Sequence, residues 1–244
     1  MHVTPDHPRY VSLSLRERLI QAHERGIVSI AGLIAHGRGE AFDYLLGEYT
    51  HGFAIDAIEA MAANIVLARH PVFVVNGNVA GLVAEDVVAL SRDAPLHLEV
   101  NLFTPSAGRT RTIVELIEGL GGVAHTPEED TATLPGVSSS RSSISVFGLG
   151  SADFVVAPLQ DGDMVHALKK AGMKTATIDL NPLSRSAHDA DITVVDNITR
   201  AVPLIRDAVR FLKKRSRKEL EVISRFDKEG ALHEAHRSMT ERYR

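Results

Sequence analysis

An arginine between two glycines is the first feature of this sequence that could do chemistry. It lies in the run AHGRGE at residues 35–40, directly after an apolar stretch. Glycine lets backbone N–H groups approach an anion, and the guanidinium of Arg38 can bind a phosphate or carboxylate through paired hydrogen bonds. We therefore expect either an anion site in a turn before a helix that starts near Glu40, or a plain glycine turn in which Arg38 pairs with a nearby acid.

A second polar run, DLNPLSRS at residues 179–186, directly follows a predicted strand, and Asp196-Asn197 follows the next strand. A carboxylate at a strand end can hold a ribose hydroxyl or a magnesium ion, and Asn, Ser and Arg side chains bind phosphate oxygens or a purine edge. Loop geometry alone also selects Asp, Asn, Pro and Ser. The repetition of this chemistry at two successive strand ends favours a nucleotide site.

Two shorter polar turns are weaker candidates. NGN at residues 76–78 could direct amide groups and helix N–H groups at a ligand, or simply cap the helix that follows. DGD at residues 161–163 places two carboxylates around a glycine, which suits either a divalent cation or a capping turn.

Several familiar catalytic motifs are missing from the sequence. It has no cysteine, no Walker A lysine motif, no HExxH and no GxSxG. The run GLGSAD at residues 148–153 precedes a predicted strand instead of following one, so it is not a dinucleotide-binding fingerprint. Any chemistry must use groups other than thiols or a serine nucleophile in that motif.

The alternation of strand and helix patterns predicts where the polar runs lie in the fold. Short β-branched apolar runs alternate with segments in which apolar residues recur every three to four positions, which is typical of βα units around a mostly parallel sheet. The predicted strands are 72–75, 96–100, 154–157, 175–178 and 192–195, and the predicted helices are 10–25, 54–69, 110–120, 164–171 and 198–214. Ligands of such sheets collect at the carboxyl ends of the strands, where most of these polar runs are expected.

The remaining segments have a different character. Residues 126–145 are rich in Pro, Gly, Ser and Thr and predict a mobile surface loop. Residues 217–244 predict one or two charged helices that pack on the domain edge or on a partner subunit. We expect one α/β domain over residues 1–214 and a helical extension over residues 215–244.

Composition narrows the class of protein further. With 244 residues and 44% hydrophobic content, the chain can bury a core of its own. A formal charge of −4 lacks the basic excess of nucleic-acid-binding proteins, and the basic cluster at residues 213–218 is typical of a solvated helix end. No apolar run approaches the ~20 residues that cross a bilayer, and the polar start lacks a signal-peptide layout. We expect a cytoplasmic protein without nucleic-acid or membrane partners.

Motifs along nearly the whole chain resemble, in the same order, those of the archaeal phosphopantothenate synthetases, also called phosphopantoate:β-alanine ligases. These motifs are HPRY at 7–10, Arg16, AGLIAHGRGEAFDYLLGE at 31–48, VNGN at 75–78, LEVNLF at 98–103, DLNPLSRSA at 179–187 and VDN at 195–197. The runs around Arg38 and Asn181 are the most specific, and coverage is weakest over residues 104–150 and at the C-terminal end.

The resemblance implies a homodimeric, Rossmann-like ligase of coenzyme A biosynthesis. Such an enzyme condenses 4-phosphopantoate with β-alanine, uses ATP and Mg²⁺, and releases AMP and diphosphate. A carboxylate is a poor acyl donor at neutral pH, so transfer to AMP gives a mixed anhydride that the β-alanine amine can attack. This chemistry needs cations near several phosphates and no covalent nucleophile.

The resemblance also implies residue roles. Arg16 and Arg38 match positions that bind ATP. The rest of the expected nucleotide site comprises Asp179, Leu180, Asn181, Arg185, Ser186, Asn197 and Ile198. For phosphopantoate we expect His36, Asn76, Asn78 and Asn101, with Arg9 and Tyr10 completing the wall. Arg38 and His36 are the expected catalytic residues.

One turn departs from the family pattern, because PLQDGDM at residues 158–164 stands where PLEDGDR is expected. Gln160 and Met164 replace an acid and an arginine, so any role of that acid would pass to Asp161 or Asp163. Two other readings stay open. A sugar-phosphate-type isomerase would use Arg38 and the asparagine turns without ATP, and a nucleotide or coenzyme A sensor would bind without turnover.

Overall fold

A six-stranded parallel sheet forms the centre of the computed structural model, which describes residues 4–128 and 130–241. Its strand order is β3-β2-β1-β6-β7-β8, and every neighbouring pair is parallel. The strands are β1 (Pro71–Val75), β2 (His97–Val100), β3 (Ala124–His125), β6 (Phe154–Val156), β7 (Lys174–Ile178) and β8 (Ile192–Val194). The predicted α/β class is confirmed, and the five predicted strands occur with ends shifted by at most one residue.

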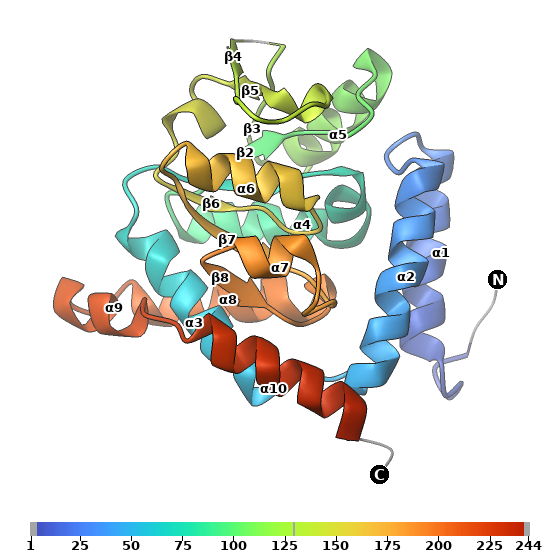
Figure 1. Ribbon diagram of the computed structural model, residues 1–244. Helices are drawn as coiled ribbons and strands as arrows, with labels where there is room; N and C mark the ends of the chain where they lie inside the picture. The colour runs from blue at the N-terminus through green and yellow to red at the C-terminus, as the bar shows by residue number, and fades with distance from the viewer. Residues whose placement is uncertain (1–3, 129, 242–244) are drawn as a thin grey trace.

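Helices follow most of the strands and cross back over the sheet. They are α1 (Tyr10–Glu24), α2 (Ile30–Leu46), α3 (Gly52–Leu67), α4 (Gly77–Asp93), α5 (Ala107–Gly119), α6 (Gly162–Lys170), α7 (Arg185–Asp189), α8 (Ile198–Leu212), α9 (Arg217–Ile223) and α10 (Lys228–Glu241). The five predicted helix ranges are confirmed to within three residues at either end. Figure 1 shows this order along the chain.

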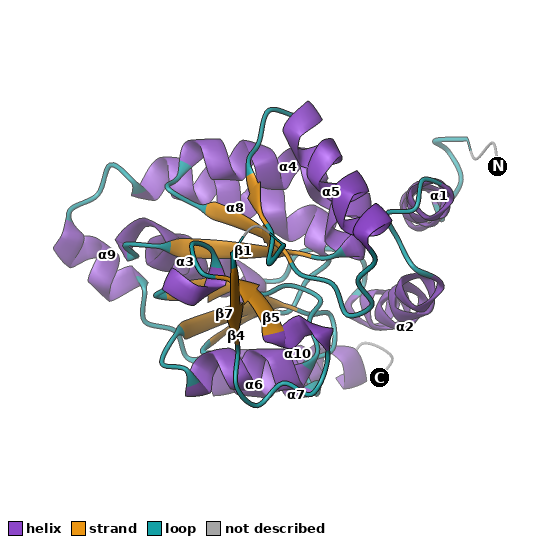
Figure 2. Cartoon of the chain, turned by 90° about the horizontal axis from the view of Figure 1, so that it is seen from above, coloured by secondary structure: helices purple, strands orange, loops and turns teal. Residues whose placement is uncertain are grey.

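The two faces of the sheet are buried under different elements, as Figure 2 shows from above. Alternate strand residues such as Phe73 and Val156 join a large apolar core with α3, α4, α5 and α8. Their neighbours Val72 and Val155 join a smaller core that includes the buried side of α6. Because successive strand residues point to opposite faces, a strand buried on both faces is apolar throughout, which is the pattern that β1 shows.

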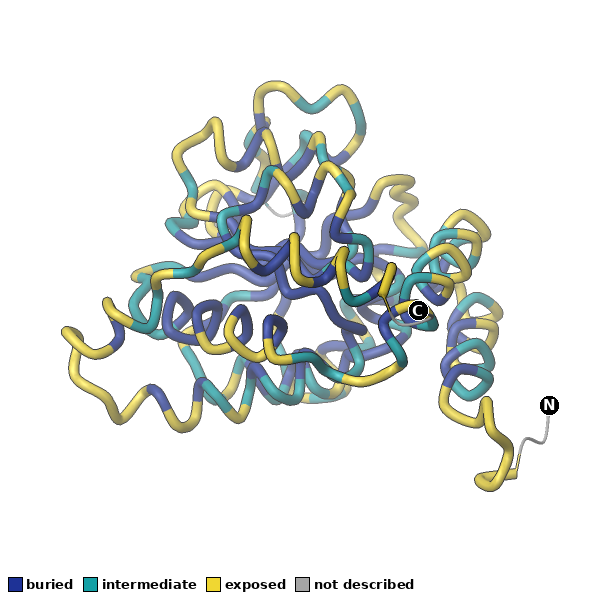
Figure 3. The backbone as a smooth tube through the Cα atoms, turned by 60° about the horizontal axis from the view of Figure 1, so that its bottom comes forward, coloured by how far each residue is buried: buried dark blue, intermediate teal, exposed yellow. Residues whose placement is uncertain are grey.

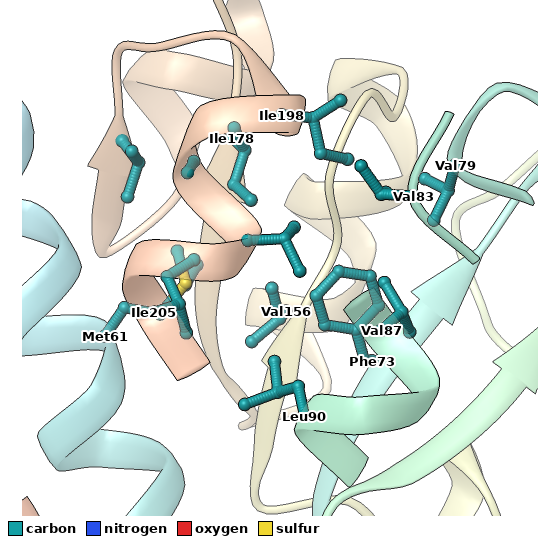
Figure 4. Packing of buried hydrophobic residues seen from close by; sticks show 14 of the residues in the cluster. Met61, Phe73, Val79, Val83, Val87, Leu90, Val156, Ile178, Ile198 and Ile205 are labelled. Carbon is teal, nitrogen blue, oxygen red and sulfur yellow. The ribbon is translucent and has the colours of Figure 1, made fainter. Parts of the chain in front are cut away.

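Phe73 lies at the middle of the larger core. Val83, Val87 and Leu90 of α4 pack beside it, and α8 closes the other side (Figure 4). Burying side chains of this size stabilises the fold by roughly 1.5–3 kcal/mol each. The strands and the inner faces of the helices form the continuous buried region of Figure 3, and exposed residues gather on the outer turns.

Of the two segments outside the βα pattern, the first differs from its prediction, and the second forms the helices that were predicted. In the described part of residues 126–145, which were predicted to be a mobile surface loop, the chain forms an antiparallel pair, β4 (Thr131–Thr133) and β5 (Ser143–Ser145), with the short helix η1 (Ser140–Ser142) between them. That prediction was wrong because Leu134 and Ile144 anchor the segment on the smaller core. The C-terminal segment forms α9 and α10, and Leu232 and Ala235 of α10 belong to the larger core of this chain.

Helices α1 and α2 run side by side beyond one edge of the sheet layers (Figure 1). Their main contacts with the rest of the molecule are to α4 and, at the end of α2, to α10. Within the part of the chain that the structure describes, no helix combines the length and apolar character needed to cross a membrane.

Candidate active site

A cavity of about 930 Å³ opens at the carboxyl ends of the strands, between the sheet and α2. The chain runs outward from β1 to β2 and β3 in one direction and from β6 to β7 and β8 in the other, so strand order reverses between β1 and β6. Open α/β sheets bind ligands at this reversal point. Asn76, at the end of β1, ties the two halves together by donating to the carbonyls of Pro158 and Leu159 at 3.2 and 3.1 Å.

Leu159 lines the cavity in an unusual backbone conformation. Its φ is 52°, in the left-handed region that residues other than glycine seldom adopt. Its amide donates to the carbonyl of Ile178 at 3.2 Å, and its own carbonyl accepts from Asn76. Strained residues of this kind persist where the surroundings hold them, and they occur often at ligand sites.

Helix N-termini converge on the cavity. The capping residues Asn76, Asp161, Ser184 and Asn197 of α4, α6, α7 and α8 all line it. The first turn of a helix offers unpaired N–H groups and a partial positive charge, which favour anions. The cavity is therefore suited to negatively charged ligands along the strand ends from β1 to β8.

The expected glycine turn around Arg38 is wrong, because residues 35–40 lie in the middle of α2. Ser29 caps this helix and Gly47 ends it with a φ of 96°. Within a helix the backbone N–H groups bond to carbonyls one turn back, so they cannot hold an anion. Arg38 nevertheless lies on the cavity wall, exposed to solvent, and its charge acts to lower the pKa of Asp179 across the cavity.

Gly32 is a glycine of α2 that close packing against α4 requires. A Cβ at this position would come within 2.3 Å of Asn78 Oδ1. Asn78 donates from Nδ2 to the carbonyl of Gly32 at 2.9 Å. This contact fixes α2 against the start of α4, so the expected substrate residue Asn78 has a structural contact at the cavity wall.

A buried carboxylate connects α2 to α1. Glu40 accepts hydrogen bonds from Arg16 Nε at 2.9 and 3.1 Å and from the Tyr44 hydroxyl at 2.7 Å. Burial raises the pKa of Glu40, but Arg16 and Tyr44 outweigh it, so the net pKa is lowered. Arg16 thus lies behind Glu40 and does not line the cavity. Arg9 and Tyr10 do not line it either; Arg9 donates to Tyr44 at 2.9 Å.

His36 lies one turn before Glu40 and lines the cavity. Its Nε2 is buried and has no hydrogen-bond partner in the described part of the chain. Burial lowers the pKa of its imidazole, with Glu40 acting in the opposite direction. The side chain is therefore a neutral imidazole at pH 7 with one ring nitrogen directed at no protein group.

A paired network closes the cavity at the β8 side. Arg200 on α8 contacts Asp43 of α2 and Asp196 at the end of β8, both at 2.6 Å. Asn197 donates to Asp43 at 2.8 Å, and its Oδ1 accepts from the Thr199 backbone at 3.1 Å to cap α8. Asn197 therefore lies at the cavity as predicted, but its amide is committed to protein groups.

The loop after β7 is also internally paired. Asp179 accepts from the Asn181 amide at 2.9 Å and from the Ser184 hydroxyl, and burial raises its pKa against these bonds. Asn181 Oδ1 accepts from Leu183 N at 2.9 Å. Arg185 forms an exposed ion pair with Asp163 at 2.7 Å.

Gly162 allows the starts of α6 and α7 to meet. A Cβ there would lie 2.4 Å from Arg185 Cβ. Ser186 then donates to the Gln160 carbonyl at 2.6 Å. Leu180 and Ile198 add the apolar part of this wall.

The opposite side of the cavity, near β1 and β2, holds polar groups without partners. Gln160 and Arg141 are each only 6% exposed. Both amide atoms of Gln160 and Nε of Arg141 lack a hydrogen-bond partner among the described residues, as does Nε of Arg109. Asn101 is buried behind them, donates to the carbonyls of Arg141 and Ser143 at 3.3 and 3.1 Å, and has a free Oδ1.

The structure thus brings most predicted residues to one cavity. Those lining it are His36, Arg38, Asn76, Asn78, Asp179, Leu180, Asn181, Arg185, Ser186, Asn197 and Ile198. Those predicted but not lining it are Arg9, Tyr10, Arg16 and Asn101. Sequence reasoning missed Glu40, Asp43, Arg109, Arg141 and Arg200. The signal for Asp43 and Glu40 was present in the motif around Arg38, whereas Arg109 and Arg141 belong to segments without a recognisable pattern.

The two residues that depart from the family pattern at residues 158–164 differ in their surroundings. Met164 is 1% exposed and packs in the smaller core under α6, and Gln160 faces the cavity. Asp161 lies 3.1 Å from Arg141, so it is part of the cavity wall and its side chain does not cap α6. Within the described ranges no group of three or more His, Asp or Glu side chains is arranged to hold a metal ion.

Comparisons with known proteins agree on one family. A family model described as phosphopantothenate/pantothenate synthetase matches residues 53–242. A 4-phosphopantoate–β-alanine ligase of Thermococcus kodakarensis is 44% identical over 234 residues, which cover 93% of this chain and 88% of that protein. One of Methanosarcina mazei is 42% identical over 231 residues, which cover 94% of this chain and 91% of that protein.

Proposed function

Since the chain belongs to the phosphopantothenate/pantothenate synthetase family, we propose that it is an ATP-dependent ligase that joins 4-phosphopantoate to β-alanine in coenzyme A biosynthesis. The observation that carries the proposal is the cavity at the point where strand order reverses, with several helix N-termini and arginines along its walls. A cavity of this size suits two anionic substrates together.

The reaction proceeds in two transfers. A carboxylate oxygen of phosphopantoate attacks the α-phosphorus of ATP, and diphosphate leaves with the bonding electron pair. The β-alanine amine then attacks the acyl carbon of the resulting adenylate, and AMP leaves. The chain supplies cations and helix N-termini that stabilise charge developing on phosphate oxygens, and a cavity that limits the access of water to the adenylate.

The nucleotide occupies the side of the cavity formed by the ends of β7 and β8. In this proposal Asp179 and Asn181 contact the ribose or purine, and Arg38, Arg185 and Ser186 contact phosphates. Backbone N–H groups at the starts of α7 and α8 are the available donors there, because the Asn197 amide is already bonded to Asp43. Arg16 acts on this side through its ion pair with Glu40.

His36 takes the proton from the β-alanine ammonium. The ammonium must lose a proton before its nitrogen can attack, and the loss requires an acceptor inside the cavity. His36 meets this need because burial lowers its pKa, so the ring is neutral at pH 7, and because its Nε2 bonds to no described protein group.

Mg²⁺ fits the exposed carboxylates at the cavity wall. Magnesium is usually held by one or two carboxylates together with substrate phosphates and water. Asp161 and Asp163 have side chains 59% and 64% exposed, so both can turn toward a ligand, and they are the residues that would hold the ion. When bound, the ion supplies charge neutralisation for the triphosphate.

A homodimer is supported by an apolar stripe on α2. Ile30, Ile34 and Leu45 are 65%, 64% and 39% exposed and share one side of the helix at a spacing of four and eleven residues. Exposed apolar stripes of this kind mark interaction surfaces. Light scattering is expected to give a dimer for the natural chain and a monomer for Ile34→Lys; a dimer of the variant would place the interface elsewhere.

The function is tested by AMP release from purified protein with ATP, Mg²⁺, β-alanine and phosphopantoate, each omitted in turn. AMP and phosphopantothenate are expected only when all are present, and ¹⁸O in the phosphopantoate carboxylate is expected to appear in AMP. ATP binding without AMP release in any mixture favours a sensor. Absence of ATP binding favours a phosphate-ester enzyme such as an isomerase.

A further inference from the structure

Two arginines of the cavity wall take no part in the proposed nucleotide site or in the proposed proton transfer. Arg109 belongs to the first turn of α5, and Arg141 lies in η1, yet both line the same cavity. They lie on either side of the segment after β2. Arg109 donates to the carbonyl of Thr104 at 2.9 Å, and the guanidinium carbon of Arg141 lies 5.5 Å from the centre of the Phe103 ring.

Neither guanidinium is fully satisfied by the protein. Arg141 is 6% exposed, its Nε has no hydrogen-bond partner, and its Nη1 meets the exposed carboxylate of Asp161 at 3.1 Å. Arg109 has an unpartnered Nε and no ion pair within the described residues. Burial lowers the pKa of both groups, although both remain charged at neutral pH. Protein interiors seldom leave buried donors unpaired unless a ligand or water supplies the acceptor.

The start of α5 adds further donors beside Arg109. Ser106 caps the helix by accepting from Arg109 N at 3.3 Å. A Cβ at Gly108, the position before Arg109, would meet no atom within 4 Å, so space is open beside the first turn. A helix start with an arginine in its first turn and a second arginine at the same cavity suits a phosphate group.

We propose that Arg109 and Arg141, with the start of α5, bind the phosphate monoester of the acid substrate, and that this subsite makes the enzyme select phosphopantoate over unphosphorylated pantoate. The assignment rests on the proposed ligase function. The carboxylate of this substrate must reach the nucleotide at the middle of the cavity, so its phosphate must lie at the end away from β7 and β8. The ends of β2 and β7 are three strand spacings apart, about 14 Å, which leaves room for both ligands.

The test compares Arg109→Gln and Arg141→Gln with Arg111→Gln as control, since Arg111 is exposed on the same helix and does not line the cavity. In the first two variants the KM for phosphopantoate is expected to rise about 10- to 100-fold, the scale of one lost charge-assisted contact, with the KM for ATP within about twofold. The preference for phosphopantoate over pantoate should fall by the same factor, and the control should keep it. A raised KM for ATP with an unchanged preference would overturn the proposal.

A calorimetric binding experiment tests this proposal independently of the proposed ligase function. Phosphopantoate and pantoate are titrated into each folded protein without ATP, so the result does not depend on turnover. Tighter binding of phosphopantoate that disappears in Arg109→Gln supports the subsite even if the natural chain releases no AMP. Equal binding of the two acids by the natural chain rejects it. If Arg141→Gln does not fold, the titration of Arg109→Gln, a change at a half-buried position, decides the test.

Discussion

The polar side chains on two walls of the same cavity differ in how far their hydrogen bonds are satisfied by the protein. The paired wall, on the β7 and β8 side, consists of Asp43, Asp179, Asn181, Asn197 and Arg200, which bond to one another or to neighbouring backbone. The open wall, on the β1 and β2 side, consists of Arg109, Arg141 and Gln160, with Asn101 buried behind them. Among the described residues, seven buried side-chain N or O atoms lack a hydrogen-bond partner; six belong to these four residues and the seventh is Nε2 of His36.

We interpret the difference as a division between groups that hold the fold and groups that are available to a ligand. A buried polar atom without a partner costs roughly 1–3 kcal/mol, so the open wall lowers the stability of the free protein. Such a cost persists at sites where a substrate supplies the missing partners. Substitutions in the paired wall are therefore expected to affect stability first, and substitutions in the open wall to affect binding first.

The largest expected effect is on the paired wall. Arg200→Met leaves Asp43 and Asp196, with side chains 8% and 1% exposed, without the cation that they share. The free energy of unfolding is expected to fall by about 3–5 kcal/mol. Arg141→Met on the open wall is the matched change and is expected to alter it by less than about 1 kcal/mol, because Nε has no partner and Nη1 pairs with the solvent-exposed carboxylate of Asp161. Urea denaturation measures both; equal losses would erase the distinction between the walls.

Glu99 gives a pH-dependent test beside the open wall. This buried carboxyl on β2 accepts from the Ser145 and Leu149 amides at 3.1 and 2.6 Å, and burial nevertheless raises its pKa to about 7. The folded chain keeps this proton at pH values where the unfolded chain has lost it. Its contribution to stability is therefore present below pH 4.5 and is lost as pH rises to about 7.

The expected size of the Glu99 effect is about 3 kcal/mol between these pH values. It is measured as the difference in unfolding free energy between the natural chain and Glu99→Gln at pH 5 and pH 7.5, so that other titrating groups cancel. The natural chain is expected to lose stability relative to the variant as pH rises. A difference that does not change with pH would show that Glu99 is ionised throughout.

Arg38 is exposed on α2 and belongs to neither wall. Arg38→Ala is expected to lower kcat/KM about 10- to 100-fold, because one charge-assisted contact to phosphate is lost, and to change stability by less than about 0.5 kcal/mol. Steady-state kinetics and thermal unfolding of the same preparation measure the two effects. A large loss of thermal stability with full activity per folded molecule would contradict the role of Arg38 in binding.

The smallest effect concerns the glycine beside Arg38. A Cβ at Gly37 would meet no atom within 4 Å, and the position lies inside α2. Gly37→Ala is expected to stabilise the protein by about 0.5–1 kcal/mol, because alanine favours the helix. Gly32→Ala is the contrasting change, since its Cβ would clash with Asn78, and it is expected to destabilise. Failure of Gly37→Ala to stabilise the protein, measured by thermal unfolding, would argue for a turn at residues 35–40.

The sequence predicted the sheet well and the cavity in part. β-Branched runs such as residues 72–75 marked the strands, and the polar residues after them, including Asn76 and Asp179, lie at the cavity as expected for strand ends. The glycines of α2 misled the prediction there, because glycine marks turns in most contexts and here allows close packing at Gly32. The local sequence carried no trace of that contact.

The open wall could not be predicted because it depends on distant contacts. Arg141 reaches the cavity only because β4 and β5 pair and Leu134 and Ile144 anchor that segment on the core. The pairing of Asp43 with Arg200 likewise joins residues 157 positions apart. Period and composition report local structure, so neither contact has a signal in them.

The most direct test of the two-walled cavity is whether its two ligands bind at once. Phosphopantoate is titrated calorimetrically into protein saturated with Mg²⁺ and an ATP analogue whose α–β bridge cannot be cleaved, with β-alanine absent. If the paired wall holds the nucleotide and the open wall the acid, one phosphopantoate binds per chain with an affinity within a few-fold of that without the analogue. Loss of phosphopantoate binding in the presence of the analogue would show that both ligands compete for one wall, and would contradict the account.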